Sequence, residues 1–202
     1  MTKKAIQFYF KAISNGDLGT VSELLDKTPE FITVCNTAPP KKHDGQSGLQ
    51  LAFKTGNFEV ANLLIIKGSD VNFMEISEIN EWTAPVLHDC IRAVIFNSYT
   101  LQKDTKIFDN AFSLLELMLT RKADPTSIDS YGNTCLHRAI LDANQMLVNP
   151  SSDFTDNILI TQLRSVFNEL FKAGADKKQS SERRESAEKL YQSFKLDKYQ
   201  LW

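Results

Sequence analysis

The sequence is poor in cysteine, glycine and proline, and it lacks any long apolar run. Its 3 cysteines lie far apart without a Cys-x-x-Cys pair, so no disulfide framework is predicted and a reducing compartment is expected. With 8 Gly and 6 Pro in 202 residues, the chain is neither collagen-like nor of low complexity. No stretch of about 18 apolar residues occurs, so we expect no membrane span.

A signal peptide and an excess of one charge are also missing. Gln7 and Lys11 interrupt the N-terminal apolar residues, so we expect a cytoplasmic protein, or one secreted into a host cell without a classical signal peptide. The 23 Lys and Arg residues are balanced by 25 Asp and Glu, and the formal net charge of −2 argues against a nucleic-acid partner. What the sequence does have is 42% hydrophobic residues, including 13 Phe, enough for a sizeable core.

Three segments of the sequence share a leucine followed three residues later by a small side chain. These pairs are Leu49 with Ala52, Leu87 with Cys90, and Leu136 with Ala139. The amphipathic segment after each pair ends in a similar phrase, which is Gly68-Ser-Asp70, Lys122-Ala-Asp124 or Gly174-Ala-Asp176. On a helix the two positions of a pair lie nearly on the same face, where a small residue lets a second helix approach closely. The repetition predicts stacked helical units.

Individual residues indicate where these helices begin and end. Thr134 offers a side-chain oxygen that can cap a first helix, and Pro85 lies near the start of another, where a missing N–H costs nothing. Gly68 and Gly174 follow the second helices, at a place that favours a left-handed residue. Lys122 occupies this place in the third unit and departs from the pattern.

The repeated units resemble the ankyrin repeat. The fourth unit resembles it most, with the matching residues Asp129, Gly132, Thr134, Leu136, His137 and Ala139, and with Cys135 in place of the family's proline. In the second unit, Gln50 stands where the family has histidine. The resemblance implies an all-α fold, an ankyrin-repeat solenoid of stacked helix-turn-helix units with short hairpin loops. It implies a single domain over 1–202 with about five units, which are 3–34 (N-terminal cap), 44–74, 80–126, 130–178 and 181–202 (C-terminal cap).

The third and fourth units and both ends depart from the family pattern. Residues 97–106 and 144–157 are polar insertions, which predict longer helices joined by longer loops on one edge. At the N-terminus, residues 3–15 and 18–27 show helical spacing without the full motif, as expected of a cap whose outer face meets water. At the C-terminus, a charged helix is predicted to begin at Ser181.

No residue pattern points to catalysis, a cofactor or a metal. His88 and His137 follow the inward leucines, where the resemblance implies that a histidine hydrogen-bonds the neighbouring hairpin. Cys90 and Cys135 lie at small, buried positions and are expected to be inert. Phosphate-binding loops, His-Glu-x-x-His and Gly-x-Ser-x-Gly are all missing. We therefore expect no enzyme; the alternative is a site in the inserted loops, where carboxylates can meet in space.

A stack of such units presents one extended concave surface, and the resemblance places a protein partner there. By the family pattern, Lys54, Arg92 and Leu141 are exposed on successive first helices and form a row. The two cations of this row favour an acidic or mixed peptide as the partner.

The segment 71–82 is longer than the family's hairpin and unusually apolar. It carries Phe73, Met74, Ile76, Ile79 and Trp82. Because Trp, Met and Phe are enriched at the centres of protein interfaces, we predict partner contacts from this hairpin, continued by Asp129 and Tyr131 on the next one. The alternative is that some of these side chains fold back onto neighbouring hairpins.

These observations predict a non-enzymatic, monomeric scaffold that binds a protein partner. Two biological roles are open, namely a bacterial effector that acts on a host protein and a cytosolic inhibitor or immunity-type protein that blocks a resident partner. A third alternative is a homo-oligomer that assembles through Trp202 or the Phe-rich faces.

Overall fold

A computed structural model describes residues 1–37, 39–99 and 104–202, and within them the fold is all-α. These residues form two isolated β-bridges but no strand. The helices are α1 (Lys3–Ser14), α2 (Leu18–Lys27), α3 (Gly48–Thr55), α4 (Phe58–Ile66), α5 (Val86–Phe96), α6 (Thr105–Thr120), α7 (Cys135–Val148), α8 (Ile158–Lys172) and α9 (Ala187–Ser193), with short 3-10 helices at Pro29–Thr33, Lys41–His43 and Leu196–Tyr199. None of the described helices is long and apolar enough to span a membrane.

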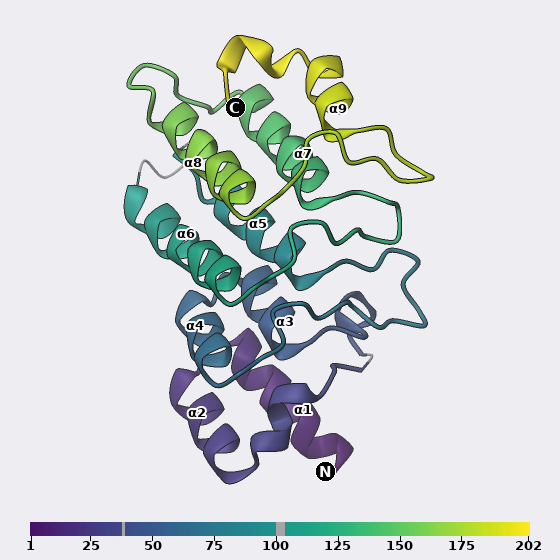
Figure 1. The fold of residues 1–202 in the computed structure, drawn as a ribbon. Coiled ribbons are helices and arrows are strands. Elements are labelled where there is room, and N and C mark those ends of the chain that lie inside the picture. The colour runs from purple at the N-terminus through teal and green to yellow at the C-terminus, as the bar shows by residue number, and fades with distance from the viewer. Residues whose placement is uncertain (38, 100–103) are drawn as a thin grey trace.

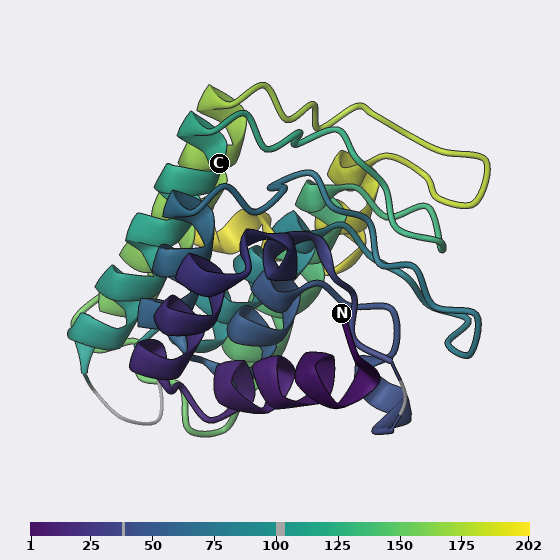
Figure 2. The same cartoon turned by 90° about the horizontal axis from the view of Figure 1, so that it is seen from below.

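The helices form two layers (Figure 1). In the first layer α1, α3, α5, α7 and α9 pack successively against one another, and in the second layer α2, α4, α6 and α8 do the same. Each first-layer helix also packs on the next helix in the chain, so α1 pairs with α2, α3 with α4, α5 with α6, and α7 with α8. The two termini lie at opposite ends of the stack, and the loops that join successive pairs project to one side (Figure 2).

The repeated leucines and small residues lie in the core, as predicted. Leu49, Leu87 and Leu136 are at most 2% exposed, and the small residues Ala52, Cys90 and Ala139 are fully buried. A fully buried leucine stabilises the fold by about 2 kcal/mol. The small residues three positions further on leave room for the close packing of α3, α5 and α7.

The helices of the third and fourth pairs are lengthened, as the insertions predicted. α3 and α4 have 8 and 9 residues, whereas α6, α7 and α8 have 16, 14 and 15. The prediction of a loop over 144–157 is wrong in part, because α7 continues to Val148 and buries Met146 and Leu147 in the core. In the other insertion, residues 100–103 lie outside the described residues.

The loops between helix pairs are hydrogen-bonded to one another. The Ile76 N–H donates to the Gly45 carbonyl at 3.0 Å. Thr83 and Ser130 exchange two bonds, of 3.0 Å from the Thr83 N–H to Ser130 Oγ and 2.9 Å from the Ser130 N–H to the Thr83 carbonyl. Gly45 has a φ of 76°, and a Cβ there would lie 2.3 Å from the Ile76 carbonyl, so only glycine fits. The loops therefore form one continuous edge of the stack.

The start of the last helix differs from the prediction. α9 begins at Ala187, and its cap is Ser186, whose side chain accepts from the Lys189 N–H, whereas a start at Ser181 was expected. Ser181 instead donates to the Gly132 carbonyl at 3.0 Å. The residues before Ser186 are thus used to bond the preceding loop, and this long-range contact outweighs their local preference for helix.

The C-terminal residue packs within the molecule. Trp202 stacks on Tyr191 with ring centroids 3.9 Å apart and lies edge-on to Phe167 and Phe171. The Trp202 ring therefore packs against α8 and α9 of its own chain. Trp202 is the residue through which the oligomer alternative supposed a contact between chains.

Candidate partner-binding groove

A cleft of about 450 Å³ opens between the first-layer helices α3 and α5 and the loop before α5. Its lining includes Phe53 and Lys54 from α3, Trp82 from the loop, and Asp89, Arg92 and Phe96 from α5. Three residues predicted to contact a partner, Lys54, Trp82 and Arg92, are thus brought together here. The sequence did not point to the other three.

Lys54 joins three parts of the cleft. Its ammonium lies 3.5 Å from Glu75 Oε2 and 3.7 Å from Asp89 Oδ1, and 5.7 Å from the centroid of the Trp82 ring. The side chains of both acids are only 2% exposed, and that of Lys54 is 21% exposed. Lys54 therefore covers two buried carboxylates, and its positive charge is balanced within the protein.

Two glutamines donate hydrogen bonds to these acids, although Glu75 Oε2 has no hydrogen bond among the described residues. Gln46 Nε2 donates to Glu75 Oε1 at 3.3 Å, and Gln50 Nε2 donates to Asp89 Oδ2 at 3.0 Å and to the Ala84 carbonyl at 3.1 Å. Gln50 occupies the position after the inward leucine that His88 and His137 occupy in the later units, and its bond to Ala84 ties α3 to the next loop. Like His137, it also forms a capping box at the start of its helix, in this case with Ser47.

Asp89 lines the cleft, and the pKa of its carboxyl is raised. Burial raises the pKa of Asp89 to about 6, although the Lys54 ammonium acts in the opposite direction. Lys54 and Gln50 both stabilise the ionised carboxylate. The loss of hydration on burial outweighs them, and for this reason the pKa is raised.

Arg92 is the second cation of the cleft. Its guanidinium lies 5.1 Å from the centroid of the Phe96 ring, which is 37% exposed. Its side chain makes no hydrogen bond or ion pair in the part of the chain that the structure describes, although its charge counters the raised pKa of the buried Asp89 and Asp142 carboxyls. A guanidinium held on an aromatic ring keeps its N–H groups available for an incoming anion.

A second depression of about 420 Å³ lies near the cleft, although the two share no lining residue. It lies between α1, the 36–43 loop and α3, and its lining includes Phe10, Lys11, Lys42, His43 and Leu51. Leu51 and Lys54 are one turn apart on the same helix. Desolvation lowers the pKa of His43, and the nearby Lys42 and Lys54 charges lower it further. We call the cleft and this depression together the groove.

The predicted row does not extend onto α7. Leu141 is half-buried and outside the groove. The next residue, Asp142, is fully buried and binds Arg138 through bonds of 2.8 and 2.5 Å, and burial raises the pKa of its carboxyl. This ion pair occupies the α7 face that follows Arg92.

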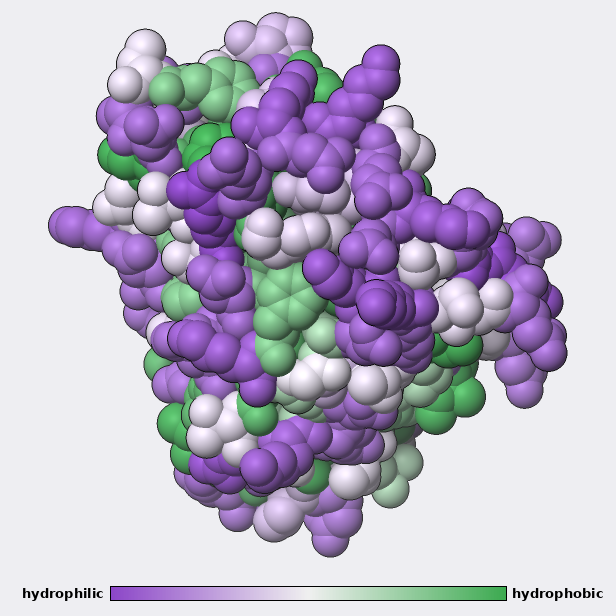
Figure 3. Space-filling model, turned by 45° about the horizontal axis from the view of Figure 1, so that its top comes forward, coloured by the Kyte–Doolittle hydropathy of each residue, from purple (hydrophilic) through white to green (hydrophobic). Residues whose placement is uncertain are grey.

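The residues of the 71–82 hairpin divide into two groups. Phe73 is half-buried against the core, as the fold-back alternative describes, whereas Met74 and Ile76 are 38% and 67% exposed. Trp82 is also half-buried, and its Nε1–H donates to Asp129 Oδ2 at 3.0 Å. Figure 3 shows hydrophobic side chains at the surface on the loop side of the molecule, at right, below a strongly hydrophilic projection.

Asp129 has a structural role in its own loop. It is 3% exposed and accepts hydrogen bonds from the backbone of Tyr131 and Asn133 as well as from Trp82. These bonds lower the pKa of its carboxyl despite its burial. The prediction that Asp129 contacts a partner does not fit this burial, whereas Tyr131, 43% exposed, is accessible.

The two histidines at the motif position differ. His137 Nδ1 accepts from the Thr134 N–H at 3.2 Å, and its Nε2 lies 2.7 Å from the Glu185 carbonyl, which is the structural role expected from the sequence. His88 is 1% exposed, and neither of its ring nitrogens makes a hydrogen bond of good geometry within the described residues, although the Ser127 backbone lies near enough to favour the charged ring. Burial lowers the pKa of His88 to about 4, so its ring is neutral at pH 7.

Two of the three cysteines are buried, and the described residues hold no cluster of metal ligands. Burial raises the pKa of the Cys90 and Cys135 thiols, so both are protonated at pH 7 and poor nucleophiles. Among residues 1–37, 39–99 and 104–202, no three His, Cys, Asp or Glu side chains lie close enough to hold a metal ion.

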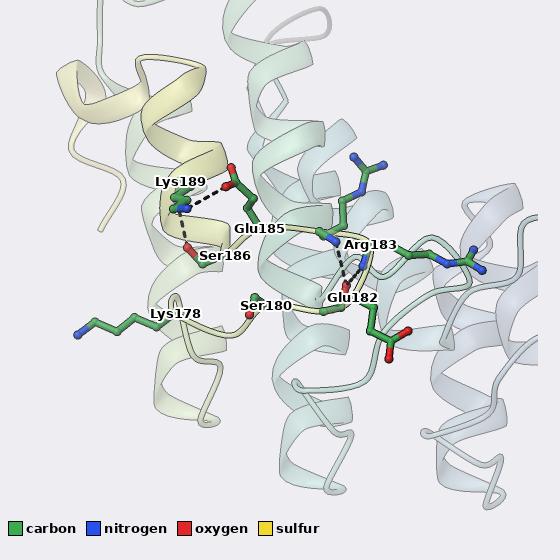
Figure 4. Close-up of a pocket in the computed structure, with 9 residues that line it drawn as sticks. Lys178, Ser180, Glu182, Arg183, Glu185, Ser186 and Lys189 are labelled. Atoms are coloured by element: carbon green, nitrogen blue, oxygen red, sulfur yellow. Dashed lines mark hydrogen bonds and ion pairs between the residues drawn. The ribbon is translucent and has the colours of Figure 1, made fainter.

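A further depression, of about 540 Å³, lies at the loop before α9 (Figure 4). Its walls carry several cations, but Lys178 and Arg183 point away from each other, and Arg183 Nη1 donates to the Ser130 carbonyl at 2.9 Å. Lys189 is paired with Glu185 at 2.8 Å. Because these side chains diverge or are already paired, they form no common site.

No protein-family model matches the chain, and no curated protein is significantly similar to it. The molecule is therefore described by its own features, namely an all-helical stack of paired helices with a groove on its first layer.

Proposed function

We propose that the protein is an ankyrin-type repeat scaffold that binds a segment of a protein partner in the groove. The family assignment is supported by the motif residues. Thr134 and His137 form a capping box at the start of α7, and the His137 ring reaches the next loop, as the Thr-x-Leu-His motif of that family implies. Lys122 takes the left-handed conformation, with a φ of 68°, at the place where Gly68 and Gly174 have 94° and 101°.

The observation that carries the binding proposal is Arg92. It is a cation on an exposed aromatic ring, in a cleft, and in the described part of the chain it makes no ion pair, its anionic neighbours Asp89 and Asp142 being buried. Trp and Arg are the side chains most enriched at energetically important positions of protein interfaces, and here Trp82 and Arg92 line one cleft. Both roles expected from the sequence, an effector and an inhibitor, need such a binding surface.

The test is affinity capture from a lysate with three versions of the tagged protein, which are wild type, Arg92→Glu and the control Arg121→Glu. Arg121 is exposed at the C-terminal end of α6 in the second layer, so the control makes the same charge change away from the groove. A protein that binds wild type and the control but not Arg92→Glu, and that binds again when both are purified, supports the proposal. Equal capture by all three versions would contradict it.

Lys54→Glu is unsuited to this test. It would place a third carboxylate beside Glu75 and Asp89, both buried, and it would destabilise the fold as well as any interface.

A further inference from the structure

We propose that the partner segment in the groove is acidic, with carboxylates against Lys11 and Lys42 at one end and against Arg92 at the other. This inference rests on the proposed function, because it names the chemistry of the segment that the scaffold binds.

The free charges of the groove all have the same sign. Lys11 and Lys42 are exposed, and neither makes a side-chain hydrogen bond or ion pair within the described residues. The Arg92 side chain makes no ion pair there either, although its charge counters the raised pKa of the buried Asp89 and Asp142. The chain as a whole carries a formal charge of −2, so this cationic groove is a local feature and does not follow from composition.

The carboxylates near the groove are not available to a ligand. None of the residues that line the depression at α1 is Asp or Glu. In the cleft, Asp89 is the one acid in the lining, and it and its neighbour Glu75 are covered by the Lys54 ammonium. An incoming segment therefore meets Lys11, Lys42 and Arg92 rather than a balanced mixture of charges.

The cleft also offers apolar surface beside Arg92. Phe96 there is 37% exposed and Trp82 is half-buried, whereas Phe10 and Leu51, which line the depression with Lys11, belong to the core. Apolar walls lower the local dielectric and strengthen an ion pair that forms against them. Arg92, stacked on Phe96, can bind a carboxylate through two parallel hydrogen bonds. The expected segment thus combines Asp or Glu with apolar residues.

The inference can be tested with defined peptides by fluorescence anisotropy at low salt. The acidic probe is a fluorescein-labelled, amidated peptide of alternating Glu and Ala, and the comparison probes replace Glu by Gln or by Lys. We expect wild type to bind the Glu-Ala probe at least about tenfold more tightly than the others, and we expect Lys11→Glu/Arg92→Glu to remove that preference. The matched control Lys106→Glu/Arg121→Glu changes two exposed cations of α6 and should retain it.

A second readout places the probe on the surface. Carbodiimide treatment joins a carboxylate to a neighbouring amine, so amide cross-links from the Glu-Ala probe to Lys11 or Lys42 are expected. Cross-links confined to lysines of the second layer, such as Lys27 on α2, would overturn the inference.

The remaining outcomes separate this inference from the proposed function. If the Lys-Ala probe binds in the groove in place of the Glu-Ala probe, or if no probe binds while a captured partner still depends on Arg92, the acidic assignment is wrong and the scaffold proposal stands. If the captured partner is insensitive to Arg92→Glu, the scaffold proposal itself fails.

Discussion

Asp89 Oδ1 lies 3.7 Å from the Lys54 ammonium. Asp89 belongs to the lining of the cleft, but it is only 3% exposed. The two residues come from different helices, α5 and α3, and their contact binds the two units together as well as shaping the cleft. The same pair also links the cleft to pH, because the Asp89 carboxyl takes up a proton near pH 6.

Asp89→Asn should change how stability depends on pH. The pKa of Asp89 is about 6 in the folded protein and 3.8 for an aspartate in the unfolded chain, so the folded state binds this proton more tightly. The Asp89 carboxyl therefore raises the free energy of unfolding as pH falls from 6 to 4. In Asp89→Asn this contribution is lost, so the free energy of unfolding should fall more steeply on acidification, by up to about 1.4 kcal/mol per pH unit. Urea unfolding at several pH values, followed by circular dichroism, measures the slope; parallel slopes for variant and wild type would contradict the shift.

His88→Gln should change the slope in the opposite direction. The pKa of His88 is about 4 in the folded protein and 6.5 for a histidine in the unfolded chain, so the unfolded chain binds the proton first and acid favours unfolding between pH 6.5 and 4. A neutral glutamine removes this loss, and the variant should resist acid better than wild type by up to about 1.4 kcal/mol per pH unit. In wild type the contributions of His88 and Asp89 to the pH dependence of the free energy of unfolding have opposite signs and largely cancel. The double variant Asp89→Asn/His88→Gln tests this, because its pH dependence should match that of wild type.

Lys122→Gly should stabilise the protein. Lys122 has a φ of 68°, which is strained for any residue with a Cβ, and its carbonyl bond to Asn72 Nδ2 at 3.0 Å uses only backbone atoms of Lys122. We expect a gain of about 0.5–1 kcal/mol in the free energy of unfolding, after the greater freedom of glycine in the unfolded chain is counted. The control Lys122→Ala removes the charge and keeps the strain, so it should show no gain. A gain of the same size in both variants would assign the effect to charge.

His137→Ala and His137→Gln should differ in stability. Alanine leaves the buried Thr134 N–H and the Glu185 carbonyl without their ring partners, at a cost of about 2–3 kcal/mol. Glutamine should cost less than about half of that, because Gln50 makes the corresponding contacts to its own cap and to the Ala84 carbonyl. Thermal or urea unfolding compares them, and equal losses would show that the two side chains are not interchangeable at this position.

The helical units could be predicted from the sequence because their signals are local. The inward Leu87 and Leu136, the small Ala139 and the Thr134 cap each act within one or two helical turns, and all four lie as expected. The start of α9 was misplaced because Ser181 can cap a helix as well as Ser186 can, and only the bond from Ser181 to Gly132 in another loop decides between them.

The sequence by itself determined the layout of paired helices and the buried face of each, since helical spacing and end residues are local properties. The tertiary structure alone decided which charges are free. Glu75 and Asp89 are far apart in the chain and meet under Lys54, whereas Arg92 stacks on its own helix and makes no ion pair in the described residues. Pairing and burial depend on neighbours brought together by folding, and for this reason the cationic groove became visible only in three dimensions.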